Sequence, residues 1–231
     1  MLLDKFKHSI PFTVVLCEQN LKANCTECGM IVLVPKRFRS IKNEIRVLGI
    51  DDARFVPRTK GTVDLVGVVY RGGYWFEGVM RTEITIDGLD ATENLAAMIK
   101  NSPYYGEIRV IVLDGVTFAG FNVVDISELF YGVDLPIMSV AREKPNLEEI
   151  RSALKNFSDF EKRWQAMLNA GELFEVETRI GENPVYVQTA GFLREDAVKI
   201  LRRTSTRSNI PEALRVAHII ASGLSRSIEK I

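Results

Sequence analysis

Three short, mostly apolar stretches constrain the fold of this chain more than any other feature of the sequence. They are IRVLGID (45–51), IRVIVLD (108–114) and LPIMSVA (135–141), and segments with a helical repeat separate them at 90–102 and 122–132. Strands that are apolar at almost every position must be covered on both faces, which is typical of a parallel sheet between helices. With 231 residues, of which 46% are hydrophobic, the chain can bury such a core as one domain.

A hairpin pattern precedes the second stretch. Residues 62–87 form two strand-like runs that meet at Gly72 and Gly73, and in the second run Glu77 and Arg81 alternate with apolar residues. This pattern predicts two antiparallel strands with one exposed and one buried face. Together with the right-handed crossover rule, it predicts an α/β fold with a mixed five-stranded sheet in the order 3-2-1-4-5. Strand 2 is antiparallel to the others, and helices cover both faces.

The remaining segments suggest how the chain divides. We expect residues 41–231 to form the domain and residues 1–40 to be a loosely ordered extension, with Met30 as an alternative start. Downstream we expect two short helices within 146–170, a strand or extended loop at 183–191, and helices at 194–205 and 211–228. The extension contains Cys17 and a C-x-x-C pair, Cys25 and Cys28. An odd number of cysteines argues against a disulfide framework, and a zinc site would have to recruit Cys17 and His8.

Charge and hydropathy exclude some classes of function. Lysine plus arginine and aspartate plus glutamate both number 30, so no global field draws the protein to nucleic acid or to a membrane surface. No apolar run reaches the roughly 18–20 residues of a membrane helix, and the start has no secretory pattern. We therefore expect a cytoplasmic protein without a membrane partner.

Two aspartates mark the candidate site. Asp51 and Asp114 end two of the apolar stretches, and the carboxyl ends of parallel strands form the ligand crevice of such sheets. If the two strands are neighbours, the carboxylates face each other, and a divalent cation would neutralise them. Hard oxygen ligands suit Mg²⁺ or Mn²⁺. The alternative is that each aspartate caps the turn that follows it.

The order of several runs resembles a known family. VLGID, VLDGVTFAG, IMSVAREKP and IPEALRVAHIIASGL occur at separations that are similar to those of the endonuclease V group in the ribonuclease H-like superfamily. GIDDA, TEITIDGLDAT and LDGVTFAGFN resemble the archaeal endonuclease dU family more closely. The resemblance spans residues 45–228.

The resemblance implies specific roles. It places the catalytic metal ligands at Asp51, Asp90 and Asp114, and a fourth catalytic residue at His218. The basic residue that contacts nucleic acid corresponds to Lys144, with Arg142 as the alternative, and Asn122 is a further candidate contact. These roles imply a metal-dependent endonuclease acting on DNA, rather than RNA, beside deoxyuridine or deoxyinosine. The alternatives are a non-catalytic binding module for nucleic acid or protein, and an RNA or nucleotide phosphohydrolase.

Several of these residues have a structural alternative. Asp90 with Glu93 fits a capping box, in which case Asp87 is the substitute ligand. His218 shares a face with Leu214 and would also fit as a core histidine. Asp52 points away from Asp51 if the strand continues and is then a turn residue. Asn122 could cap the helix that follows it.

The sequence also departs from the endonuclease V pattern. It has only DGLDA where that group carries an aromatic, proline-containing wedge, and Gly120 and Phe192 stand where histidines are expected. These differences put inosine recognition in doubt. Four aromatic residues could stack on a displaced base or belong to the core, namely Tyr74, Trp75, Tyr104 and Tyr105. The C-terminal 41 residues are rich in cations that could contact phosphates or form a solvated helix face: Arg194, Lys199, Arg202, Arg203, Arg207, Arg215, Arg226 and Lys230.

Overall fold

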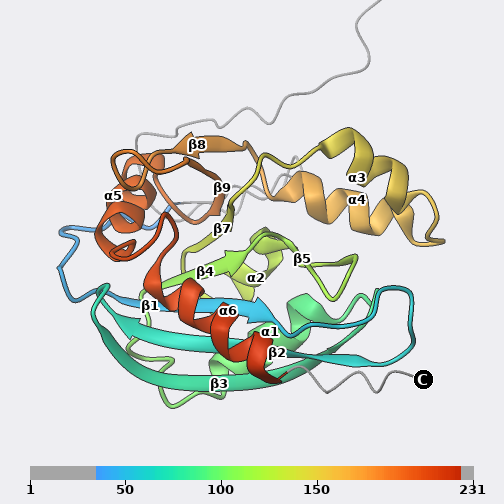
Figure 1. Ribbon diagram of the computed structural model, residues 1–231, viewed down its shortest axis with the longest axis horizontal. Coiled ribbons are helices and arrows are strands. Elements are labelled where there is room, and N and C mark those ends of the chain that lie inside the picture. The colour runs from blue at the N-terminus through green and yellow to red at the C-terminus, as the bar shows by residue number, and fades with distance from the viewer. Residues whose placement is uncertain (1–34, 225–231) are drawn as a thin grey trace, which may run out of the picture. The chain divides into compact units, whose positions relative to one another are not determined.

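The structure is a computed structural model that describes residues 35–224 (Figure 1). The expectations for the cysteine pair, for Cys17 and His8, for Met30 and for Arg226 and Lys230 fall outside the described residues. Within residues 35–224, no helix combines the length and the apolar character that a membrane span requires.

A seven-stranded mixed sheet organises the domain, in the order β3-β2-β1-β4-β7-β9-β8. Its strands are β1 (Arg46–Asp52), β2 (Thr62–Arg71), β3 (Trp75–Thr85), β4 (Val110–Asp114), β7 (Ile137–Ala141), β8 (Phe174–Val176) and β9 (Val185–Ala190). β1, β4 and β7 run parallel, and β2 is antiparallel to β1. The predicted order of five strands is confirmed, with β7 as the fifth.

Two strands extend the sheet beyond the prediction. β9 pairs antiparallel with β7, and β8 pairs antiparallel with β9. β9 resolves the open choice between strand and loop at 183–191 in favour of a strand. β8 has only three residues, too few for an alternating pattern to show. A separate pair, β5 (Thr117–Phe118) and β6 (Asn122–Val123), forms a small two-stranded ribbon after β4.

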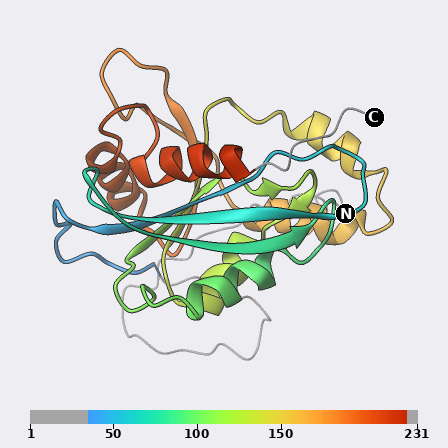
Figure 2. The same ribbon diagram turned by 60° about the horizontal axis from the view of Figure 1, so that its bottom comes forward.

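Six helices occur in the described part of the chain. They are α1 (Ala91–Lys100), α2 (Ile126–Val133), α3 (Leu147–Leu154), α4 (Phe160–Asn169), α5 (Arg194–Thr204) and α6 (Glu212–Leu224). The two short helices predicted within 146–170 are α3 and α4, and the two C-terminal helices are α5 and α6. Figures 1 and 2 show α5 and α6 on one side of the sheet and α1 and α2 on the other.

Alternation along the central strands divides the core into two layers. Leu48 and Ile50 of β1 pack with Leu95 of α1 and Leu129 of α2. The residues between them face the other layer, where Val47 packs among residues of α5 and α6. Because side chains alternate along a strand, Asp51 faces the α6 layer and Asp52 faces the α1 layer. This arrangement confirms that the two aspartates point in opposite directions.

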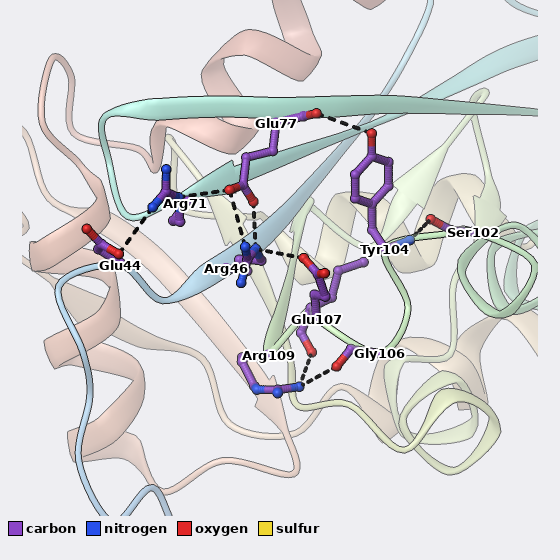
Figure 3. A network of polar contacts seen from close by, with 10 residues as sticks. Glu44, Arg46, Arg71, Glu77, Ser102, Tyr104, Gly106, Glu107 and Arg109 are labelled. Atoms are coloured by element: carbon purple, nitrogen blue, oxygen red, sulfur yellow. Dashed lines mark hydrogen bonds and ion pairs between the residues drawn. The ribbon is translucent and has the colours of Figure 1, made fainter.

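A polar network fixes the β2–β3 hairpin to the start of β1 (Figure 3). Glu77 accepts from Nε of Arg46 at 2.6 Å and pairs with Nε of Arg71 at 2.8 Å, while Glu107 lies 3.1 Å from Arg46. The Tyr104 hydroxyl donates to the backbone carbonyl of Glu77 at 3.2 Å. The network ties three segments together at the end of the sheet that lies away from Asp51.

The four aromatic residues separate into two pairs. Tyr104 and Tyr105 pack against the core and use their hydroxyls on backbone carbonyls, so the core alternative holds for them. Tyr74 and Trp75, at the hairpin, are 63% and 47% exposed. Only this second pair offers free ring surface.

Candidate metal centre

Three predicted residues meet at the carboxyl ends of β1 and β4. One oxygen each of Asp51 and Asp114 and one ring nitrogen of His218 lie within 4.8 Å of one another. The two aspartates come together because β1 and β4 are parallel neighbours, with Ile50 opposite Leu113. His218 comes from α6, and its Nδ1 lies 2.6 Å from Oδ2 of Asp51. We call this group the acidic cluster.

A glycine allows α6 to come close enough for this contact. A Cβ atom at Gly49 would lie 2.3 Å from the backbone carbon of Ala213 and from the backbone nitrogen of Leu214. Only a residue without a Cβ permits so close an approach of helix and strand. Gly49 therefore sets the depth at which α6 packs on β1, and with it the reach of His218.

The start of α6 is fixed by a buried carboxylate. Glu212 is fully buried and accepts from the backbone nitrogen of Arg207 at 3.2 Å and from Nη2 of Arg215 at 2.8 Å. Although burial acts in the opposite direction, the hydrogen bonds and charge of Arg215 lower the pKa of Glu212. A charge that is buried in this way requires its partners, so α6 has little freedom to move away from β1.

Burial and neighbouring negative charges make ionisation of the carboxylates in and beside the acidic cluster unfavourable. Burial, reinforced by the charge of Asp51, raises the pKa of Asp114 to about 6, against an opposing effect of Arg142 and His218. Burial and the charges of Asp51 and Asp114 likewise raise the pKa of Asp52 to about 6, although the amide of Ala119 donates to its Oδ2 at 2.6 Å. Such a group of carboxylates favours a bound cation.

His218 is not a core histidine. Its side chain is 48% exposed, which contradicts the core alternative. Nδ1 faces Asp51, and within residues 35–224 the other ring nitrogen has no hydrogen-bond partner. A carboxylate that holds one nitrogen of a histidine fixes the orientation of the ring and leaves the second nitrogen for chemistry.

Asp90 and Asp87 do not join the acidic cluster. Asp90 accepts from the hydroxyl of Thr85 at 2.8 Å and from Nδ2 of Asn122 at 2.6 Å. These bonds, against the effect of burial, lower the pKa of Asp90. Its side chain makes no capping hydrogen bond to α1, so the capping-box alternative is wrong. Asp87 accepts from the amide of Phe121 at 2.8 Å and holds that loop.

Asn122 has a structural position that excludes its predicted contact with nucleic acid. It is fully buried. Its Oδ1 accepts from the amide of Ala91 at 3.1 Å, at the start of α1, and its Nδ2 also donates to the carbonyl of Thr85. The prediction that it caps its own helix is also wrong, because α2 begins later and Asp125 caps it.

Arg163 is a site-supporting residue that the sequence did not reveal. It is 3% exposed and donates to the carbonyls of Asp87, Gly88 and Phe121. Asp159 binds the same guanidinium at 2.7 Å. The i, i+4 spacing of Asp159 and Arg163 was visible in the sequence, but such pairs usually lie at the surface. Here the pair joins the turn before α1 to the loop before α2.

The two basic candidates after β7 are both exposed. Arg142 acts on the pKa of Asp114 through its charge, which puts it within electrostatic reach of the acidic cluster. The structure therefore favours Arg142 over Lys144 as the cation nearest the site.

Comparisons with known proteins agree with this geometry. A family model described as endonuclease dU matches residues 43–225. A UPF0215 protein of Methanothermobacter thermautotrophicus is 52% identical over 189 residues, which cover 81% of this chain and 91% of that protein. A crystal structure of a protein of unknown function from Archaeoglobus fulgidus is 38% identical, with a TM-score of 0.71 over 79% of this chain and 99% of that chain.

A more distant likeness concerns the fold alone. Ciona intestinalis endonuclease V, solved in complex with a 24mer DNA containing an inosine followed by a ribo-adenosine, has a TM-score of 0.50 at 17% identity. The match covers 77% of this chain and 84% of that chain. The sheet order and the positions of Asp51 and Asp114 at its centre fit a ribonuclease H-like core.

Proposed function

The chain belongs to the endonuclease dU family, and from that premise we propose that it is a divalent-metal-dependent endonuclease. Its proposed reaction is the hydrolysis of a phosphodiester bond in DNA beside a deaminated base, with deoxyuridine preferred over deoxyinosine. The observation that carries this proposal is the acidic cluster, in which Asp51, Asp114 and His218 meet at the carboxyl ends of the central strands β1 and β4. We also propose that residues 41–231 are the catalytic domain and that residues 1–40 are an addition to it.

The donors present fit a hard divalent cation. Asp51 and Asp114 supply carboxylate oxygens, and burial with the charge of Asp51 raises the pKa of Asp114 by more than Arg142 and His218 lower it. Oxygen ligands of this kind suit Mg²⁺ or Mn²⁺. A bound ion would lower the pKa of a water and stabilise the charge that develops on the leaving oxygen.

The side chains of the site divide the remaining work. Asp51 and Asp114 are the proposed metal ligands, and Asp51 also orients His218 through the 2.6 Å contact. The free ring nitrogen of His218 positions the attacking water or accepts its proton. Arg142, exposed beside Asp114, is the proposed contact for the scissile phosphate, with Lys144 further along the same segment. Asp90 takes a positioning role, because Thr85 and Asn122 already occupy its carboxylate.

The preference for deoxyuridine has two supports. The family model is described as endonuclease dU, and the loop that follows β4 has no room for the histidine of the endonuclease V pattern. Gly120 has a φ of +89°, and a Cβ there would lie 2.3 Å from Oδ1 of Asp87. Gly120 therefore presents no side chain to a deaminated purine, and its positive φ disfavours a larger residue there.

Strand cleavage tests the proposal directly. Labelled duplexes that contain one deoxyuridine, one deoxyinosine or neither are incubated with Mg²⁺, Mn²⁺ or a chelator, beside single-stranded DNA and RNA. We expect cleavage of the deoxyuridine duplex that needs the cation and is lost in Asp51→Asn, Asp114→Asn and His218→Ala. Asp134→Asn is the control, because Asp134 lies away from the cluster at the end of α2 and is 80% exposed.

Three results would contradict the proposal in different ways. Equal cleavage of damaged and undamaged duplexes would remove the lesion preference. Preferential cleavage of RNA would favour the phosphohydrolase alternative. Binding of DNA without any cleavage, together with no heat on titration of Mn²⁺ in a calorimeter, would indicate a non-catalytic binding module.

A further inference from the structure

A cavity lies at the opposite end of β1 from the acidic cluster. It has a volume of about 610 Å³ and lies between the β2–β3 hairpin, the C-terminal end of α5 and the segment at 178–180. The pairing of Arg46 with Arg71 marks this end of the sheet, and Asp51 is paired five residues further along. At about 3.3 Å per residue, Asp51 lies roughly 17 Å along the strand from Arg46, and the cavity lies beyond that end, where Asn43 lines it.

Two arginines give this cavity a positive charge. Arg202 and Arg203, in the last turn of α5, both line it. Arg202 donates to the carbonyl of Glu177 at 3.0 Å and Arg203 donates to the carbonyl of Ile41. Neither is paired with a carboxylate among residues 35–224, whereas Arg179 beside them is paired with Glu182 at 2.7 Å. The two guanidinium groups are therefore held in place by neutral acceptors and keep their full charge.

A buried hydroxyl lines the same cavity. Ser205 is 3% exposed, lines the cavity, and its Oγ makes no hydrogen bond within the described part of the chain. A buried polar group without a partner is unfavourable and calls for an explanation. Basic residues at a helix C-terminus are common because they complement the helix dipole, but that tendency does not account for the hydroxyl. A ligand with acceptor oxygens accounts for both features.

An exposed aromatic residue completes the wall of the cavity. Tyr74 is 63% exposed, and Trp75 packs edge-on against it at a centroid distance of 5.7 Å. Trp75 is in turn covered by Arg71, whose guanidinium lies 5.0 Å from the ring centroid. Tyr74 is thus a supported ring with a free face. A cationic groove beside such a ring is how proteins hold single-stranded nucleic acid without reading its sequence.

We propose that this cavity, the arginine pocket, binds a single-stranded segment of the nucleic acid that is cleaved at the acidic cluster. Arg202, Arg203 and Ser205 contact backbone phosphates, and Tyr74 stacks on a base. The proposal rests on the proposed function, because it takes the ligand to be the substrate strand. Its consequence is that affinity depends on strand length, since a strand must reach from one site to the other.

Binding measurements in a chelator test this without any need for turnover. Fluorescence anisotropy is recorded with single strands of about 4 and about 16 nucleotides, the limits of site size for such grooves, across a range of salt concentrations. The variants are Arg202→Gln with Arg203→Gln, and Tyr74→Ala. Lys199→Gln is the matched control, because Lys199 lies on the same helix, is 65% exposed at its side chain and does not line the pocket.

We expect the wild type to bind the long strand more tightly than the short one. The double variant should reduce the slope of log affinity against log salt by about 1.4 on the long strand, since each lost phosphate contact removes about 0.7. Tyr74→Ala should weaken the same complex about 5- to 150-fold. The short strand can occupy the pocket alone, so both variants should also weaken its lower affinity, and Lys199→Gln should leave the binding of both strands unchanged.

Several outcomes would overturn the inference. One is wild-type binding that does not depend on length, and another is an unchanged slope and affinity in both variants. Arg202 and Arg203 also donate to backbone carbonyls, so the thermal midpoint of the double variant is measured as a control for folding. If the double variant is unfolded, the affinity of Tyr74→Ala for the long strand tests the inference instead. A third is a rise in the thermal midpoint of the wild type with deoxyuridine monophosphate but not with the long strand. That result would assign the pocket to a free nucleotide. Loss of cleavage specificity with intact length-dependent binding would instead contradict the proposed function alone.

Discussion

Replacing Asp114 with asparagine separates a metal ligand from a structural aspartate. The substitution keeps the shape of the side chain and removes the charge that burial and Asp51 destabilise. If Asp114 holds a cation, the variant should lose cation binding and cleavage together, while the metal-free protein should become more stable. If Asp114 only caps a turn, the variant should lose about 0.5–2 kcal/mol and keep its response to the cation.

The size of the effect follows from the raised pKa. A change from the ordinary 3.8 to about 6 corresponds to roughly 3 kcal/mol of penalty for ionising Asp114 at neutral pH, as an upper limit for a group that is not fully buried. At about 2–4 °C for each kcal/mol in a domain of this size, the metal-free variant should unfold up to about 12 °C higher. Manganese at a hundred times its dissociation constant should add about 2.7 kcal/mol to the wild type and nothing to the variant.

Thermal unfolding with a chelator and with millimolar Mn²⁺ measures both effects. Asp134→Asn is a suitable control, because Asp134 is exposed and has a φ of +51°, a conformation that asparagine tolerates. Its midpoint should respond to manganese as the wild type does. A manganese shift of equal size in the wild type and in Asp114→Asn would refute the assignment of Asp114 as a ligand. The assignment would also be refuted if manganese changed the midpoint of neither protein and Asp114→Asn were less stable than the wild type in chelator.

Three further predictions concern the support of the site. Gly49→Ala should push α6 away from β1, because the new Cβ would lie 2.3 Å from the backbone of Ala213. We expect loss of cleavage with a lower unfolding midpoint, whereas Gly223→Ala, at an open position of α6, should keep cleavage and leave the midpoint equal or slightly higher. Arg163→Met should destabilise the protein by about 3–5 kcal/mol in denaturant unfolding, since it removes the pair with Asp159 and leaves three carbonyls without this donor. Arg163→Lys should restore only part of the lost free energy of unfolding, because lysine lacks the planar guanidinium group. In a chelator the free energy of unfolding should fall as pH rises from about 4 to 6, because the raised pKa values of Asp114 and Asp52 make the folded state bind more protons than the unfolded state in that window. A double Asp52→Asn, Asp114→Asn variant should show a flatter profile, and an equally steep profile would contradict the two shifts.

The central strand order and the meeting of Asp51 with Asp114 were predictable from the sequence. Both depend on strong and local signals, namely apolar runs that end in aspartate and a hairpin at a pair of glycines. The crossover rule then leaves few ways to arrange these elements. The contact between His218 and Asp51 was not predictable from such signals, because 167 residues separate them. It depends on the close packing of α6 against Gly49 of β1, which no local sequence pattern predicts.

Asp90 and Asn122 show how a local signal can mislead. The spacing of Asp90 and Glu93 favours a capping box, yet the amide of Ala91 is satisfied by Asn122, 31 residues away in sequence. The position of Asn122 likewise favours an N-cap of the helix that follows it, yet Asp125 caps that helix. A buried amide has two donors and an acceptor that must be satisfied, and the fold supplies the partners from the other side of the loop. Only the tertiary structure decides between these pairings.

Asp52 connects the loop after β4 to the acidic cluster. The amide of Ala119 donates to Asp52 at 2.6 Å, its carbonyl accepts from the amide of Asp87 at 2.9 Å, and the amide of Asp52 donates to Asp51 at 2.8 Å. Gly120 fits against Asp87 with no space for a side chain. A base that displaced this loop would break the bond to Asp52 and disturb Asp51 beside it. If the proposed function holds, we expect activity on lesions that leave the loop in place, which is easier for a small deaminated pyrimidine than for a purine.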